Sequence, residues 1–78
     1  MDETNKFIPV VAKFDVNGNI TPLAIDWNGH VVGIDKVLEA RTAASLKHGG
    51  FGKRWTVRIR STRCYIFCDG GRWWLERT

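Results

Sequence analysis

The 78-residue chain lacks several patterns that mark particular classes of protein. Its apolar runs are far shorter than the roughly 18 residues of a membrane-spanning helix, so we expect no membrane association. The first residues, Met1 to Asn5, have neither the basic nor the apolar region of a signal peptide, so we expect a cytoplasmic protein. No window of about 11 residues or more repeats apolar positions at helical spacing, which disfavours long helices.

Cysteine and histidine are scarce, with two of each. Cys64 and Cys68 stand four residues apart in a predicted strand, which separates them by about 13 Å on one face and excludes a disulfide between them. His30 and His48 do not complete a zinc-site spacing, so we expect no metal. We interpret the cysteines as small hydrophobic residues, buried and kept reduced.

The length of the chain suits one small core, because chains divide into several cores only at much greater length. Four tryptophans, four phenylalanines and one tyrosine supply the apolar surface that such a core needs. We expect residues 1–6 to form a flexible N-terminal tail and residues 7–78 to form a single all-β domain.

Apolar and polar residues alternate wherever the sequence is regular, which predicts strands. Asn17-Gly18 and Asn28-Gly29 are typical of tight hairpin turns, because both residue types tolerate positive φ angles. The residues between 42 and 52, which include three glycines, are predicted to form one long loop. The prediction is about six antiparallel strands, folded either as a small SH3-like barrel or as a strongly curved sheet.

Two further turns set the register of the last three strands. A two-residue turn at Ser61-Thr62 would place Val57 opposite Ile66, and a turn at Gly70-Gly71 places Ile66 opposite Leu75. Both registers collect the apolar residues of the three strands on one inner face.

Charge is divided unequally between the two halves of the chain. Residues 1–40 carry three lysines against six carboxylates, a net charge of −3, whereas residues 41–78 carry nine cations against two carboxylates, a net charge of +7. Seven of those nine cations are arginines, whose planar guanidinium suits phosphate and carboxylate groups. The basic half therefore indicates either a polyanionic partner or an attraction between the two halves.

The outer face of the last three strands combines arginines with aromatic residues. The candidate nucleic-acid-binding residues on it are Arg54, Arg58, Arg60, Arg63, Tyr65, Phe67 and Trp74. In this hypothesis the arginines neutralise phosphates and the aromatic rings stack on the bases of a single strand. The predicted loop adds the candidates Lys47, His48 and Lys53.

Two other uses of this face remain open. In a protein-interaction module, the aromatic residues would anchor a partner peptide or a second copy of the chain, with the loop at 42–52 closing over it. In a purely structural domain, Phe67 and Trp74 would form a cross-strand pair covered by the stems of the arginines.

No motif indicates an enzyme or a cofactor. The segment Gly49 to Arg54 lacks the first glycine and the Ser or Thr of a phosphate-binding loop, and it leads into a predicted strand where that motif needs a helix. Ser45 and His48 stand three apart, but no buried acid is evident to orient the histidine. We therefore expect no catalytic residues.

Two stretches of the sequence, Ile25 to Leu38 (IDWNGHVVGIDKVL) and Gly71 to Arg77 (GRWWLER), resemble a family of small bacterial all-β proteins. The shared pattern is a tryptophan-led hairpin, a Val-Leu step, a basic strand and a closing Trp-Trp-Leu-Glu. The family is a domain of unknown function, and some members are encoded near Y-family translesion DNA polymerases. The resemblance implies an accessory role in DNA repair, with a repair polymerase as the protein partner, and it assigns no catalytic residues.

Overall fold

The computed structural model describes residues 7–44 and 51–77, and every regular element in them is a β-strand. The strands are β1 (Val10–Phe14), β2 (Ile20–Trp27), β3 (His30–Gly33), β4 (Lys36–Ala44), β5 (Phe51–Ile59), β6 (Thr62–Asp69) and β7 (Arg72–Arg77). The predicted all-β class is confirmed, with seven strands rather than about six. Among the described residues, no helix has the length and apolarity that a membrane crossing requires.

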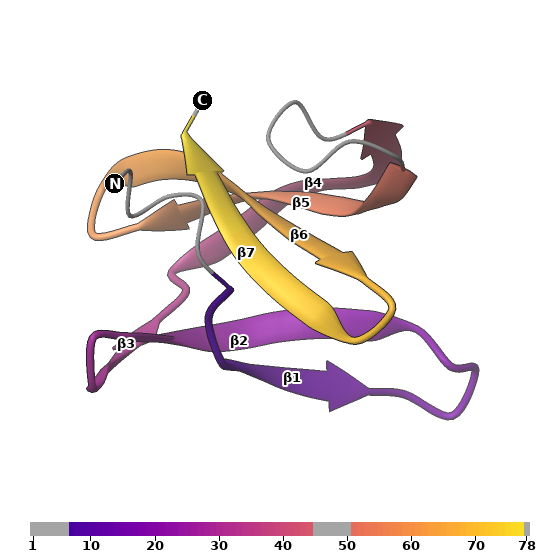
Figure 1. Cartoon of the computed structure of the whole chain (residues 1–78), viewed down its shortest axis with the longest axis horizontal. Coiled ribbons are helices and arrows are strands. Elements are labelled where there is room, and N and C mark those ends of the chain that lie inside the picture. The colour runs from indigo at the N-terminus through magenta and orange to yellow at the C-terminus, as the bar shows by residue number, and fades with distance from the viewer. Residues whose placement is uncertain (1–6, 45–50, 78) are drawn as a thin grey trace.

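The seven strands form two antiparallel sheets and do not close into one barrel within the described residues. β1, β2 and β3 make a three-stranded sheet, and β4 to β7 make a four-stranded sheet in sequence order. Figure 1 shows the three-stranded sheet as a layer beneath the strongly twisted four-stranded one. Each hairpin joins neighbours in the chain, as expected when loops are short.

Backbone hydrogen bonds join the two sheets at two corners. At the first corner, Ile8 donates to the carbonyl of Trp73 on β7 (2.8 Å), and the next residue, Pro9, accepts from Asp26 on β2 (2.9 Å). At the second corner, between β3 and β4, Ile34 donates to the carbonyl of Leu23 on β2 (2.9 Å), and the next residue, Asp35, donates to the carbonyl of Arg58 on β5 (2.9 Å). These bonds hold the inner faces of the sheets against each other.

Two of the glycine-containing turns have both central residues at positive φ, as the sequence predicts. Asn28 and Gly29 have φ angles of 55° and 86°, and Gly70 and Gly71 have φ angles of 60° and 82°. The predicted pairing across the second turn is confirmed, since Ile66 is the partner of Leu75.

The predicted turn at Ser61-Thr62 is wrong by one residue. The turn is formed by Arg60 and Ser61, both at positive φ, so that Val57 pairs with Cys64 rather than with Ile66. A shift of the pairing by two residues keeps every side chain on its predicted face, because side chains alternate with a period of two. A contact remote in sequence supports the observed turn, since Oδ2 of Asp35 accepts a hydrogen bond from the backbone N–H of Arg60 (2.9 Å).

The long loop predicted at residues 42–52 is shorter in the structure. β4 continues to Ala44 and β5 begins at Phe51, so both ends of the predicted loop are paired strand. Residues 45–50 and the predicted tail at residues 1–6 lie outside the described residues. The extension of β4 past the predicted boundary reflects tertiary pairing with β5, which overrides weak local signals.

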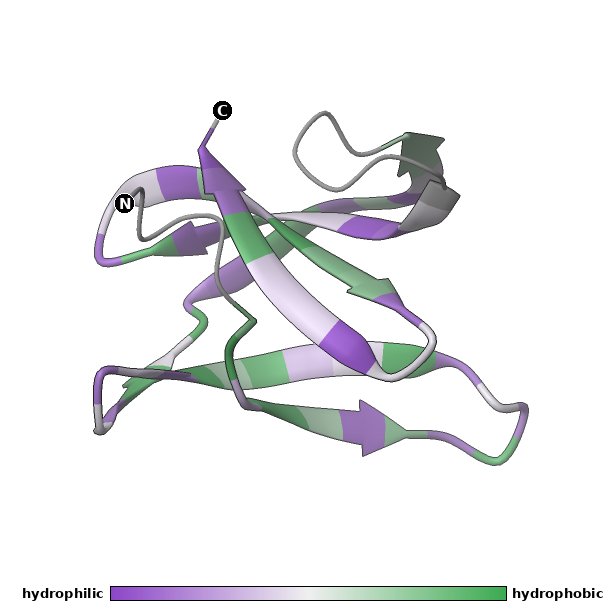
Figure 2. Cartoon of the chain, viewed as in Figure 1, coloured by the Kyte–Doolittle hydropathy of each residue, from purple (hydrophilic) through white to green (hydrophobic). Residues whose placement is uncertain are grey.

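The core lies between the inner faces of the two sheets. Its buried residues are Ile8, Ile25, Trp55, Val57, Cys64 and Ile66. Trp55 stacks on Trp73 of β7 with ring centroids 5.2 Å apart. Apolar and polar residues alternate along the strands (Figure 2), which is why one side of each sheet packs against the other sheet. Cys64 and Cys68 are free thiols on this inner face, as predicted.

Candidate nucleic-acid interface

The outer face of the four-stranded sheet carries a buried aromatic pair. Phe67 and Trp74 are cross-strand partners with parallel rings, 5.4 Å between centroids and 4° between planes. Phe67 is 1% exposed and Trp74 is 2% exposed. The hypothesis that these two rings offer open surfaces to nucleic-acid bases is therefore wrong, because their faces are already covered within the chain.

A continuous series of ring contacts explains this burial. Tyr65 meets Phe67 edge to face at 6.4 Å, and Phe7 meets Trp74 edge to face at 5.9 Å. The guanidinium of Arg54 lies 4.3 Å from the centroid of Tyr65, at one end of the series. We call this set the aromatic ladder: Tyr65, Phe67, Trp74 and Phe7, with Arg54 and Arg72 over its two end rings. Offset and edge contacts of this kind stabilise a small sheet beyond the area they bury.

Arg54 and Glu76 contribute polar contacts to the aromatic ladder. Arg54 is 3.5 Å from Oε1 of Glu39, and its side chain is 19% exposed, so its guanidinium is held within the protein. Oε2 of the buried Glu76 accepts a hydrogen bond from Nε1 of Trp74 (2.8 Å), which satisfies the indole N–H away from water. Arg54, predicted as a phosphate ligand, is thus mainly occupied by Tyr65 and Glu39.

The remaining predicted arginines lie at one end of the molecule. Lys36, Arg58 and Arg63 stand directly opposite one another across β4, β5 and β6, and all three are exposed. Arg60 occupies the turn between β5 and β6, and Arg77 is the partner of Cys64 at the end of β7. We call these five cations the basic end: Lys36, Arg58, Arg60, Arg63 and Arg77. Asp35 also lies here, with its carboxylate bonded to the backbone of Arg60.

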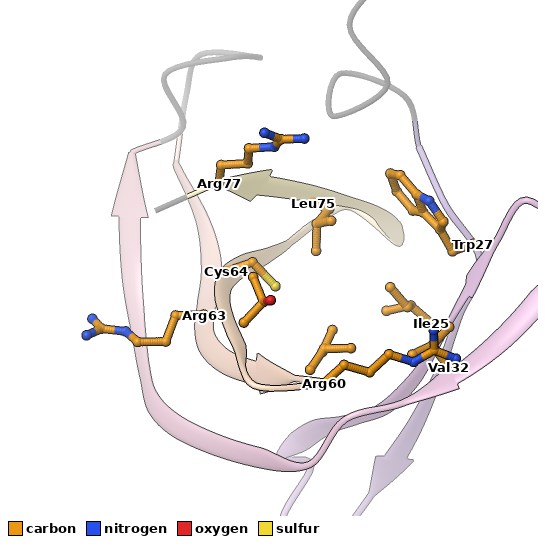
Figure 3. Close-up of a pocket in the computed structure, with 10 residues that line it drawn as sticks. Ile25, Trp27, Val32, Arg60, Arg63, Cys64, Leu75 and Arg77 are labelled. Atoms are coloured by element: carbon orange, nitrogen blue, oxygen red, sulfur yellow. The ribbon is translucent and has the colours of Figure 1, made fainter.

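A cavity of about 600 Å³ opens at the basic end, between the two sheets. Its apolar lining comes from Ile25, Trp27 and Val32 of one sheet and from Ile59, Cys64 and Leu75 of the other. Its polar lining is Thr62 and three arginines, Arg60, Arg63 and Arg77. In Figure 3, Arg60 extends toward Ile25 and Val32, whereas the guanidinium of Arg63 points away from the cavity.

A second cavity, of about 340 Å³, is lined in part by Lys53, Trp55 and Cys68. Lys53 was predicted in a loop, but it lies on β5, paired with Thr42 and Cys68. The other two loop candidates, Lys47 and His48, fall outside the described residues. Among the described residues that line this second cavity, Lys53 is the one cationic side chain. An anionic ligand would therefore be bound less strongly there than at the basic end.

The thiols of the inner face are held in their neutral form. Burial raises the pKa of Cys64 above its ordinary value of 9.0, and burial is also the main cause of the raised pKa of Cys68. A neutral thiol is a weak nucleophile and a weak metal ligand. Residues 7–44 and 51–77 contain no group of three or more His, Cys, Asp or Glu side chains that could hold a metal ion.

Sequence reasoning missed two members of the basic end, Lys36 and Arg77. Lys36 joins it because β4 pairs with β5 from Lys36 onward, a long-range pairing that alternation alone does not reveal. Arg77 was within reach of prediction, since the correct register across Gly70-Gly71 places it opposite Cys64, near the start of β6.

Comparison of this chain with models of known protein families, with curated proteins and with solved structures finds no match. The features of the described residues that bear on function are therefore the basic end and its cavity.

Proposed function

We propose that this protein is a non-enzymatic module that binds single-stranded nucleic acid through the basic end. The observation that carries this proposal is the row of exposed cations Lys36, Arg58 and Arg63, placed directly opposite one another on three adjacent strands. Phosphates lying along the row would pair with these cations and release counterions from the strand.

The spacing of the row supports a flexible strand as the partner. Neighbouring strands lie about 4.8 Å apart, and the long side chains of lysine and arginine extend the reach of each position. A single strand adjusts its backbone to such a row more readily than a duplex, whose phosphates are fixed by its helix. The proposal differs from the sequence-based hypothesis, because the stacking role of Phe67 and Trp74 is removed and Lys36 and Arg77 are added.

Salt dependence of binding tests this proposal. We expect labelled decathymidylate to bind with a log–log salt slope near −2 between about 50 and about 200 mM salt, because three phosphates are neutralised. Arg58→Gln and Arg63→Gln should each reduce the slope by about 0.7 and weaken binding to all sequences alike. Fluorescence anisotropy measures both quantities.

The matched control for these substitutions is Lys13→Gln, which removes one exposed cation from β1 in the other sheet. It should leave the slope unchanged. Absence of binding by the unmodified protein at low salt would overturn the proposal, as would equal effects of all three substitutions.

A protein-interaction module is the second candidate, and exposed apolar residues on the three-stranded sheet favour it. Val11 is 55% exposed and Val31 is 71% exposed, and both lie on the side of the sheet that faces away from Ile25. A second copy of the chain, or a repair polymerase as the family resemblance implies, would cover them. Sedimentation of the protein and of Val31→Asp tests self-association, which the substitution should abolish if this face pairs with itself.

The finer description of the fold as an open SH3-like barrel is also a proposal. It is supported by the two corners, where adjacent residues bond to different sheets: Ile8 to β7 and Pro9 to β2 at the first, and Ile34 to β2 and Asp35 to β5 at the second.

A further inference from the structure

The cavity at the basic end has the size and lining of a site for a small flat ligand. Its volume of about 600 Å³ lies within the range of roughly 300 to 1,000 Å³ that is typical of small-molecule sites. Trp27 enters the lining from β2 and Leu75 from β7, so the two sheets supply apolar walls on both sides. A nucleobase is flat and has two apolar faces, and base stacking on an aromatic ring is favourable for every base.

The polar groups of the cavity are hydrogen-bond donors. The guanidinium groups of Arg60 and Arg77 donate and do not accept, and the hydroxyl of Thr62 does both. Among the described residues that line the cavity there is no Asp or Glu to accept from an amino group. A ligand whose edge carries keto oxygens therefore suits this lining better than a ligand whose edge carries an exocyclic amine.

The backbone at the mouth of the cavity is strained at one of these donors, Arg60. Arg60 has a φ of 49° at the first position of a two-residue turn, where Asn or Gly is favoured. Its N–H is held by Oδ2 of Asp35, and its side chain extends toward Ile25 and Val32 on the opposite sheet (Figure 3). Strain of this kind persists only where surrounding contacts maintain it, and it is frequent at binding sites.

We infer that this cavity receives one base of the nucleic-acid strand bound along the basic end, and that it prefers a keto base (thymine, uracil or guanine) to adenine or cytosine. The inference rests on the proposed function, because the strand held by the row Lys36, Arg58 and Arg63 on the outer face would turn over the end of the sheet at Arg60 to reach the mouth of the cavity between the inner faces. Trp27 provides the stacking surface, and Arg60 and Arg77 donate to the keto oxygens. The cavity thereby recognises the identity of one base, whereas the row of cations binds the phosphates independently of sequence.

Decamers of tetrahydrofuran abasic sites separate phosphate binding by the basic end from base binding by the cavity. The first carries no base, and four others carry a single thymine, guanine, cytosine or adenine at the same central position, so all five have the same charge. We expect one thymine or one guanine to tighten binding about tenfold over the abasic decamer, and cytosine or adenine to add much less. Anisotropy at constant salt gives the five affinities.

Each outcome bears on a different claim. If the abasic decamer binds and no base improves its affinity, the base pocket is overturned and the proposed phosphate-binding function stands. If all four bases improve it equally, the keto preference is overturned. If neither the abasic decamer nor decathymidylate binds, the proposed function fails, and this inference fails with it.

Substitutions in the turn of Arg60 and Ser61 test whether the gain in affinity from a single base arises in the cavity. Arg60→Gly removes a donor while keeping the backbone N–H that bonds Asp35, and it should abolish most of the tenfold gain from thymine. Ser61→Gly changes the neighbouring turn residue without loss of charge and should keep the gain. Retention of the full gain in Arg60→Gly, with thermal stability at least equal to that of the unmodified protein, would overturn the role assigned to Arg60.

Discussion

At the scale of single residues, Arg60 and Ser61 adopt backbone angles that their residue types disfavour and that the tertiary structure imposes. Their φ angles of 49° and 67° lie in the left-handed region, which costs most L-residues roughly 1 kcal/mol each. Asn28 and Gly29 adopt similar angles in the turn between β2 and β3, but those residue types tolerate them. The difference is that the backbone N–H of Arg60, in the turn after β5, donates a hydrogen bond to the carboxylate of Asp35, a residue 25 positions away.

Arg60→Gly is expected to stabilise the protein by about 0.5–1 kcal/mol, because glycine relieves the left-handed strain and retains the N–H that bonds Asp35. Urea unfolding followed by tryptophan fluorescence measures this change. Arg58→Gly is the matched control, since the same replacement in a regular part of β5 should destabilise by a similar amount. Destabilisation by both substitutions would contradict the assignment of strain to residue 60.

Asp15 organises the turn between β1 and β2. Its carboxylate accepts from the backbone N–H of Asn19 and Asn17 (2.9 Å each), and also from the side-chain amide of Asn19 (3.2 Å). The bonds from Asn19, backbone first and side chain second, lower the pKa of Asp15 below its ordinary value of 3.8. Because the folded pKa is depressed, the stabilisation is present above pH 3.8 and is lost as the pH falls through the folded value.

The protein should therefore be more stable than its Asp15→Asn variant at neutral pH, and the two should converge as the pH falls below 3.8. Carboxyl NMR titration of Asp15 gives the folded pKa directly, and urea unfolding at several pH values gives the stability difference. A titration midpoint above 3.8, or a difference that grows in acid, would contradict this account.

At the scale of elements, the pairing of β5 with β6 is close enough to exclude a side chain at one position. A Cβ added to Gly52 would lie 2.9 Å from the backbone carbonyl oxygen of Cys68. A backbone atom cannot move aside as a flexible side chain does, so β6 would have to shift. Gly33, at the end of β3, has no atom within 4 Å of the same added Cβ.

Gly52→Ala is thus expected to destabilise the protein by about 1–3 kcal/mol through overpacking. Gly33→Ala should be neutral or slightly stabilising, because alanine restricts the unfolded chain and meets no obstacle in the fold. Thermal or urea unfolding of both variants tests the pair. Equal small effects at the two positions would show that β6 adjusts to the extra methyl group.

At the scale of the whole molecule, the two sheets share one core and are held together at both corners. Ile8 lies in the segment before β1, and Ile25 lies on β2 of the three-stranded sheet. Both pack with Trp55, Val57 and Ile66 of the four-stranded sheet. Neither sheet can bury its inner face alone. We therefore expect the domain to unfold in one cooperative transition, as small single domains usually do.

Ile25→Ala provides the test of this cooperativity. The substitution should cost about 2–5 kcal/mol, and its effect should appear equally in far-UV circular dichroism and in tryptophan fluorescence, which three tryptophans of the four-stranded sheet dominate. Coincident transitions by both probes are expected for the unmodified protein as well. Loss of dichroism at lower urea than loss of fluorescence would indicate that the three-stranded sheet melts independently.

Local sequence determined the strands, most of the turns and the side of the sheet on which each residue lies. Alternation places Val57, Cys64 and Ile66 on one face whichever residues form the turn, because a register shift of two preserves the period of two. The dipeptides Asn28-Gly29 and Gly70-Gly71 encode their turns in their own backbone preferences. These features depend only on neighbours in the chain.

Tertiary structure alone decided which faces are covered and which cations lie together. Phe67 and Trp74 are predicted on an outer face, but Phe7, remote in sequence, packs on Trp74 and helps to remove that face from water. The pairing of β4 with β5 brings Lys36 to Arg58, and the curvature of the sheets leaves a cavity beside them. Periodicity sets the direction of a side chain, whereas its exposure depends on segments that fold back from far along the chain.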